Sequence, residues 1–234
     1  MKNGVFYGIG VGPGDPELIT VKALKTIAAC SCVSFIDPGK GRKAAAFEIA
    51  RAAMPEIELK EKIRLVIPMT QDKELMRTHH IAAFNAVSER LNAGIDVCFL
   101  TIGDVSIYST FGYLQKIARD KGFETRMVSG VPSFCAAAAV LNTDLVLGEQ
   151  NLHVFYTGET ELDKFLALKG TQVFMKGPSA VPNLIKLIKE KGLDAGLVSN
   201  CGMDNQIVVK PVKEIPIGQE FGYYSLVIVK EGEG

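Results

Sequence analysis

Four glycines fall at alternate positions in the segment FYGIGVGPGDPEL, residues 6–18. They are Gly8, Gly10, Gly12 and Gly14. Asp15-Pro16 follows them, and aspartate favours the N-cap of a helix while proline favours its first turn, so the glycines span a strand-to-helix turn. One such glycine would only allow close packing of the strand and the helix. Four in seven residues leave the backbone bare, and we expect a ligand to approach it.

The spacing of these glycines excludes two common phosphate-binding loops. The dinucleotide fingerprint G-x-G-x-x-G needs a third glycine where this chain has Pro13 or Asp15. The pair Gly39-Lys40 is followed by Gly41, where a P-loop needs serine or threonine. A carboxylate at the helix N-cap also repels a polyphosphate. We therefore expect the loop to admit a bulky, flat or neutral group.

A second candidate for chemistry is Asp104 in VCFLTIGDVSIYSTFGYL, residues 97–114. It follows a predicted strand, and the carboxyl ends of strands are where open α/β sheets place ligand-binding groups. Asp104 could equally cap a helix that begins at Ser106. A third candidate is VSGVPSFCAAAAVL, where Gly130 ends a strand. Its alanine run permits close approach of a ligand, or forms an ordinary packed helix.

The elements that must position these residues alternate through the first half of the chain. Strands are predicted at residues 4–10, 31–37, 63–67 and 96–101, and helices at 16–29, 43–54 and 72–93. Such alternation predicts a mostly parallel sheet covered by helices, with ligands at the carboxyl ends of its strands.

The second half is richer in strands and is predicted to be α+β. Strands are predicted at 123–128, 152–156, 171–175, 194–199, 206–210 and 223–229, and helices at 133–141 and 179–191. We place the domain boundary after Lys121. The prediction is an α/β protein with two domains, 1–121 with the glycine-rich loop and the Gly-Asp motif, and 122–234.

Composition excludes several classes of partner. Twenty-six basic and twenty-six acidic side chains give no net charge, so neither nucleic acid nor an anionic membrane is expected as the main partner. No segment approaches the roughly 20 apolar residues of a membrane span, and we expect a cytoplasmic protein. Five cysteines without C-x-x-C spacing indicate reduced thiols. His79-His80 lacks a third ligand, so no metal site is expected.

The motifs in this order resemble the tetrapyrrole methylase family, S-adenosylmethionine-dependent enzymes of corrin and siroheme synthesis. The family's first-loop signature is similar to residues 10–15 with Leu18 and Thr20, and its GD…Y element to Gly103-Asp104 with Tyr108. Within the family, the segments TIGDVSIYSTFGYL, VIPMTQDKE and GVPSF most resemble precorrin-2 C20-methyltransferases.

The resemblance implies two α/β domains with S-adenosylmethionine in the cleft between them, and a homodimer. Carried over position by position, it assigns cofactor-lining residues to both halves of the chain. These are Pro13, Gly103, Asp104, Ile107, Pro132, Ser133, Met175, Cys201 and Gly202.

The resemblance also implies the reaction, methylation of C20, an electron-rich carbon of precorrin-2 or cobalt-factor II. Asp104 is the candidate base for the proton that leaves this carbon, or else it holds the ribose or ammonium of the cofactor. The substrate is a polycarboxylate, so cations should bind it. The candidates are Lys40, Arg42 and Lys43, with Arg77 and His79-His80 less favoured.

Three alternatives stay open. A sibling tetrapyrrole methylase would act at another ring carbon. A nicotinamide-dependent dehydrogenase would use Asp37, after the second predicted strand, to bind the ribose, although the broken glycine fingerprint counts against it. A noncatalytic ligand-binding module also remains open, because no motif in the sequence requires a catalytic pair of nucleophile and base.

Overall fold

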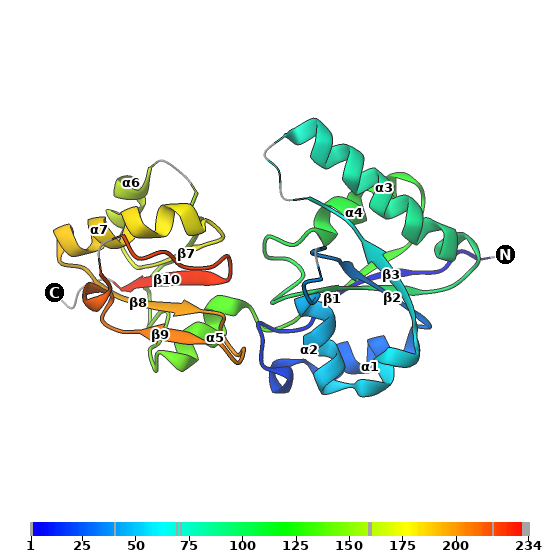
Figure 1. Cartoon of the computed structure of the whole chain (residues 1–234), viewed down its shortest axis with the longest axis horizontal. Coiled ribbons are helices and arrows are strands. Elements are labelled where there is room, and N and C mark those ends of the chain that lie inside the picture. Colours follow the sequence, from blue (N-terminus) through cyan, green and yellow to red (C-terminus); the bar gives the residue numbers. More distant parts are fainter. Residues whose placement is uncertain are drawn as a thin grey trace. The chain divides into compact units, whose positions relative to one another are not determined.

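The computed structural model describes residues 2–39, 41–68, 70, 72–158, 161–216 and 218–230. The chain divides into two compact units, Met1–Pro132 and Ser133–Gly234, each built on one sheet with helices (Figure 1). The predicted α/β class is confirmed. The division follows Pro132 and not Lys121, because the strand β5 (Thr125–Val128) pairs with β1 (Phe6–Gly10) in the first sheet.

The first sheet has five parallel strands in the order β3-β2-β4-β1-β5. The remaining strands are β2 (Cys32–Ile36), β3 (Glu61–Leu65) and β4 (Val97–Thr101). β1 lies between the central strand β4 and the edge strand β5, and Ile9 is opposite Leu100 and Val128. Because all the strands are parallel, the loops that follow β1, β4 and β5 leave the sheet along one edge.

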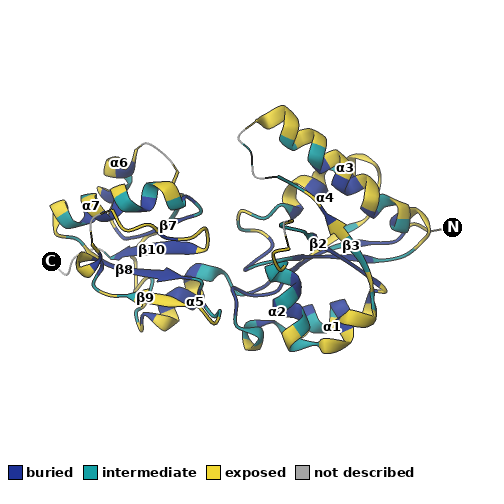
Figure 2. Ribbon diagram, in the orientation of Figure 1, coloured by how far each residue is buried: buried dark blue, intermediate teal, exposed yellow. Residues whose placement is uncertain are grey.

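Helices cover both faces of the first sheet (Figure 1). They are α1 (Val21–Ala29) and α2 (Ala45–Ala53) on one face, and α3 (Lys73–Asn92) and α4 (Phe111–Asp120) on the other. Successive side chains of a strand point to opposite faces, so Ile9 joins the core under α1 and α2 while Phe6 joins the core under α3 and α4. Figure 2 shows the inner strands of the sheet buried between helices whose outer faces are exposed, whereas the edge strand β3 is mostly exposed or half-buried.

Short polar side chains decide where the first helices begin. Asp15 accepts a 2.8 Å hydrogen bond from the backbone N–H two residues on and starts a 3-10 helix, η1 (Pro16–Leu18). Thr20 accepts a 3.1 Å hydrogen bond from the Ala23 N–H and starts α1. The helix predicted over residues 16–29 is therefore two elements, because Thr20 has extended backbone angles and caps a helix of its own.

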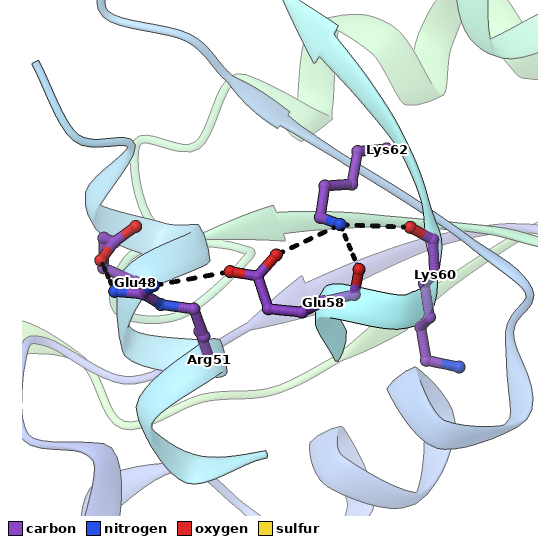
Figure 3. Close-up of polar contacts among 5 residues, drawn as sticks. All are labelled: Glu48, Arg51, Glu58, Lys60 and Lys62. Carbon is purple, nitrogen blue, oxygen red and sulfur yellow. Dashed lines mark hydrogen bonds and ion pairs between the residues drawn. The ribbon is translucent and has the colours of Figure 1, made fainter. Parts of the chain in front are cut away.

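Charged side chains join α2 to the segment that follows it (Figure 3). Arg51 pairs with Glu48 inside α2 and, at 3.5 Å, with Glu58 in the 3-10 helix η2 (Pro55–Leu59). Glu58 also lies 3.2 Å from the Lys62 ammonium in β3. These side chains are partly exposed, so the pairs orient the segment more than they stabilise the fold.

The second sheet has the order β6-β7-β10-β8-β9, in which β6 and β7 are parallel and the other pairs are antiparallel. Its strands are β6 (Leu152–Tyr156), β7 (Thr171–Met175), β8 (Asp194–Ser199), β9 (Ile207–Val209) and β10 (Ser225–Lys230). The helices are α5 (Ser133–Val140), α6 (Leu162–Leu166), α7 (Val181–Lys191), and the 3-10 helices η3 (Pro178–Ala180) and η4 (Val212–Glu214). Figure 1 shows α6 and α7 on one face of this sheet and α5 on the other.

Two further properties bear on function. In the described ranges, no helix has both the length and the apolar character needed to cross a membrane. The five cysteines all lie among the described residues and are in the reduced form, and Cys135 is exposed while the other four are buried.

Candidate functional site

Three motifs meet at the carboxyl edge of the first sheet. The loop after β1 and the loop after β4 are joined by two backbone hydrogen bonds, from the Gly103 N–H to the Gly12 carbonyl (2.8 Å) and from the Gly12 N–H to the Gly103 carbonyl (3.3 Å). Gly130, which follows β5, packs against both loops. The glycine-rich loop, the Gly-Asp motif and the Gly-Val-Pro segment therefore form one cluster, which we call the glycine edge: Gly10, Gly12, Gly103, Asp104 and Gly130.

Packing or backbone conformation explains three of the four glycines in the first loop. A Cβ on Gly8 would lie 2.5 Å from the Phe111 ring, and a Cβ on Gly10 would lie 2.6 Å from both the Gly103 carbonyl oxygen and the Gly130 nitrogen. Gly12 has a φ of 80°, in the left-handed region that side chains disfavour. The expectation that packing does not account for these glycines is wrong for Gly8 and Gly10, and the backbone conformation alone favours glycine at position 12.

Asp104 is the polar centre of the glycine edge and is 7% exposed. Its Oδ1 accepts hydrogen bonds from the Ser106 N–H (2.8 Å) and hydroxyl (2.5 Å), and its Oδ2 accepts one from the Gly130 N–H (3.0 Å). A carboxylate has about four acceptor positions, so about one remains. The helix predicted from Ser106 is wrong: Tyr108 has a φ of 47°, and α4 begins at Phe111.

The other residues predicted to line a cofactor in the first unit lie in loops after strands. Pro13 is buried in the loop after β1, and Ile107 is half-buried in the turn that Asp104 starts. Pro132 is half-buried at the end of the first unit, and Ser133 begins α5 of the second unit.

The second unit also brings predicted residues to one sheet edge. Met175 ends β7 and is opposite Leu226 in β10. The residue before Leu226, Ser225, begins β10 and is opposite Ser199 at the end of β8. Cys201 lies two residues after the end of β8 and is 5% exposed, next to a half-buried Gly202. The structure therefore places Met175 and Cys201-Gly202 at the same edge of the second sheet.

Three polar residues at this second edge were not predicted from the sequence. The Thr157 N–H donates a 2.8 Å hydrogen bond to the Met175 carbonyl. Lys176 has a φ of 61°, and its ammonium lies 3.4 Å from the Tyr223 hydroxyl and 5.4 Å from the centre of that ring. Burial lowers the pKa of Lys176 and raises the pKa of Tyr223. We call Thr157, Met175, Lys176, Cys201 and Tyr223 the polar edge.

One signal in the sequence could have found Lys176. It directly follows a predicted strand, and the rule about strand ends that applies to Asp104 applies to it. Thr157 directly follows the predicted strand at 152–156 and carries the same signal. Tyr223 carries no comparable signal, because its environment depends on contacts between distant segments.

Comparison with known proteins decides the family. The model of the family named Tetrapyrrole (Corrin/Porphyrin) Methylases matches residues 5–216. A protein of Methanocaldococcus jannaschii named "Probable cobalt-precorrin-2 C(20)-methyltransferase" is 32% identical over 96% of this chain and 95% of its own length. The chain belongs to the tetrapyrrole methylase family.

Further relatives of this methylase agree with that assignment. The cobalt-precorrin-2 C(20)-methyltransferase of Salmonella typhimurium is 29% identical over 98% of this chain and 97% of its own length. The solved uroporphyrin-III C-methyltransferase of Thermus thermophilus, complexed with S-adenyl homocysteine, has the same fold at a TM-score of 0.70, with 20% identity, and covers 97% of this chain and 98% of that one.

The cations predicted to bind substrate in this methylase lie after β2. Arg42 is exposed, and its guanidinium donates a 2.6 Å hydrogen bond to the Pro38 carbonyl in its own loop. Lys43 is exposed, and Lys40 lies outside the described residues. Asp37, the residue of the dehydrogenase alternative, accepts a 2.8 Å hydrogen bond from the Gly39 N–H. The family assignment overturns that alternative.

The adjacent histidines of this methylase have different surroundings. His79 is exposed, whereas His80 is 5% exposed and stacks on Tyr113 at 4.6 Å between ring centres. Burial lowers the pKa of His80. His80, in α3, is thus packed against Tyr113 in the first turn of α4. Within the described residues, no three histidine, cysteine or acidic side chains gather as a metal site would need.

Proposed function

We propose that this methylase transfers a methyl group from S-adenosylmethionine to C20 of precorrin-2 or cobalt-factor II, in cobalamin biosynthesis. The observation that carries the proposal is the similarity along almost the whole chain to relatives from M. jannaschii and S. typhimurium whose names specify this carbon. Similarity confined to the glycine edge would support the family but no particular ring carbon.

The residue types at each sheet edge suit parts of S-adenosylmethionine. This molecule is a cation with a sulfonium centre, a flat adenine ring and several hydrogen-bonding groups. The polar edge offers the buried thioether of Met175, the backbone of Cys201-Gly202 and the polar side chains beside them. The glycine edge offers Gly103 and Ile107, in loops whose polar groups are already ordered by hydrogen bonds. We infer that these residues, with Pro13, Asp104, Pro132 and Ser133, bind the cofactor.

The protein's main contribution is positioning. When bound, S-adenosylmethionine supplies a methyl group that is already electrophilic. The chain therefore has to hold the methyl group and the ring carbon in line and exclude water, and such positioning is worth about 7–11 kcal/mol of barrier. The glycine edge is suited to this task, because backbone packing and the three hydrogen bonds of Asp104 fix its loops.

Asp104 is our candidate for the base that removes the proton from C20. Its remaining acceptor position is the one that would receive the proton. The Ser106 and Gly130 donors hold the carboxylate in a fixed orientation, which a base in a rigid site requires. Asp104 would instead hold a polar group of the cofactor if the proton left to water.

Cations outside the two edges would bind the acidic side chains of the tetrapyrrole. We propose Lys40, Arg42 and Lys43 for this role. Arg42 and Lys43 are exposed, so their charges are accessible to a large anion. Replacing the three together with glutamine should raise the KM for the tetrapyrrole and leave the KM for S-adenosylmethionine unchanged. An unaltered KM for the tetrapyrrole would exclude this patch.

The decisive experiment is to identify the product. Purified protein is incubated with ¹³C-methyl-labelled S-adenosylmethionine and, separately, precorrin-2 and cobalt-factor II, and the methylated carbon is assigned by NMR. We expect the label at C20. Label at another carbon would identify a sibling methylase, and no transfer together with no binding of S-adenosylhomocysteine by calorimetry would favour the noncatalytic module.

We propose that the protein acts as a homodimer in the cytoplasm. The dimer rests on the resemblance to the family, and light scattering of the purified protein at micromolar concentration tests it. A mass of one chain, with methyl transfer intact, would exclude the dimer.

A further inference from the structure

Thr157 is a buried polar residue whose hydroxyl the fold does not use. The residue follows β6 directly and is 1% exposed. Within the described part of the chain, its Oγ1 is buried and makes no hydrogen bond. A buried hydroxyl without a partner is unfavourable for folding, and valine has nearly the same shape without that cost. We therefore look for a hydrogen-bond partner of this hydroxyl outside the folded chain.

Thr171 supplies the comparison within the same sheet. It begins β7 and is also 1% exposed, yet its hydroxyl donates a 2.5 Å hydrogen bond to the Leu145 carbonyl. The two residues share type, sheet and burial, and they differ in whether the fold uses the hydroxyl. Thr171 shows what a structural threonine looks like in this protein.

The surroundings of Thr157 are built closely around it. Its N–H is bonded to the Met175 carbonyl, and a Cβ on Gly177 would lie 2.6 Å from the Thr157 carbonyl carbon. Gly177 therefore lets the segment after β7 pass directly against Thr157. Gly158, the next residue, is exposed and has no side chain, so the chain that follows Thr157 is open to solvent.

We propose that the Thr157 hydroxyl hydrogen-bonds S-adenosylmethionine and positions it at the polar edge. The inference rests on the proposed function, because it assigns a further residue to the same cofactor. A neutral hydroxyl, which both donates and accepts, suits the hydroxyl and amino groups of this molecule. The carboxylates of a tetrapyrrole are better matched by cations.

The test compares four proteins: wild type, Thr157→Val, Thr157→Ser and Thr171→Val. Calorimetry measures the Kd of S-adenosylhomocysteine, steady-state kinetics measures both KM values, and thermal unfolding measures stability. We expect Thr157→Val to raise the Kd and the KM for S-adenosylmethionine by roughly three- to tenfold, the range of one net hydrogen bond. Thr157→Ser, which keeps the hydroxyl, should bind within twofold of wild type.

Stability separates this role from a structural one. Thr157→Val should unfold at the wild-type temperature or above it, because valine removes a buried hydroxyl without a partner. Thr171→Val should unfold about 2–4 °C lower and bind S-adenosylhomocysteine as wild type does. The matched pair thus predicts opposite patterns of binding and stability.

Three results would overturn the inference. They are a Kd for Thr157→Val within twofold of wild type, a rise in the KM for the tetrapyrrole alone, and a loss of stability in Thr157→Val equal to that in Thr171→Val. If wild type binds S-adenosylhomocysteine and methylates C20, each of these results removes only the role of Thr157. If wild type binds no S-adenosylhomocysteine, the proposed function and this inference fall together.

Discussion

The glycine edge and the polar edge use their residues in opposite ways. At the glycine edge, Gly10 and Gly130 are in backbone contact, and Asp104 accepts three hydrogen bonds from its own chain. At the polar edge, the Thr157 hydroxyl has no partner among the described residues and Lys176 is held where burial disfavours its charge. The glycine edge is thus ordered by its own hydrogen bonds and backbone contacts. The polar edge, in contrast, has a hydroxyl and an ammonium group whose burial the fold does not fully compensate.

Replacing Gly130 with alanine is the strongest test of this contrast. The new Cβ would clash with the Gly103 carbonyl oxygen and the Gly10 backbone, which no flexible side chain can relieve. We expect Gly130→Ala to lower the free energy of unfolding by at least about 3 kcal/mol, measured in urea.

The matched control for this change lies in α4. A Cβ on Gly112 meets nothing within 4 Å, so Gly112→Ala should stabilise the helix by about 0.5–1 kcal/mol. Equal stability of the two variants would mean that the glycine edge is not closed by backbone contact.

Replacing Asp104 with asparagine should have the next largest effect. An amide keeps one acceptor oxygen, so its NH₂ group must face either the Ser106 donors or the Gly130 N–H. We expect the free energy of unfolding to fall by about 1–3 kcal/mol. We also expect kcat to fall far more than substrate affinity.

A variant of Ser106 distinguishes the effect of Asp104→Asn on stability from its effect on catalysis. Ser106→Ala removes one of the three hydrogen bonds and leaves the carboxylate. It should lose about 1 kcal/mol of stability and retain most of the turnover. Unchanged turnover in Asp104→Asn would exclude the role of base.

The two edges also differ in how far the sequence predicts them. Alternating apolar periodicity locates β1, β4 and β7 and places Asp104 at a strand end, because these are local properties. The sequence does not reveal that β5 pairs with β1, since that contact joins segments more than a hundred residues apart. It was this pairing that moved the domain boundary to Pro132.

The roles of the glycines and of Thr157 likewise depend on contacts between residues that are far apart in the sequence. The spacing of Gly8 and Gly10 indicates a bare backbone, but their neighbours come from α4 and from the loops after β4 and β5. An unused hydroxyl is a property of three-dimensional surroundings, so no pattern around Thr157 could signal it.

Replacing Lys176 with methionine should change the free energy of unfolding least, and the sign of this change is informative. Burial lowers the pKa of Lys176 below its ordinary value of 10.5, so the folded state binds this proton more weakly than the unfolded chain does. At pH values below the folded pKa, the burial of charged Lys176 lowers the free energy of unfolding by its full amount. This destabilisation decreases as the pH rises from the folded pKa toward 10.5.

At pH 7, Lys176→Met should therefore be at least as stable as wild type, because methionine keeps an unbranched apolar stem without the charge. Urea unfolding at increasing pH should show wild type gaining stability relative to the variant. Burial raises the pKa of Tyr223, which is present in both proteins, so its alkaline titration largely cancels in the difference. The contradicting result is a wild type that is more stable than Lys176→Met at pH 7 by an amount that does not change with pH. It would show that the buried charge of Lys176 does not destabilise the fold. The contrast between the two edges would then rest on Thr157 alone.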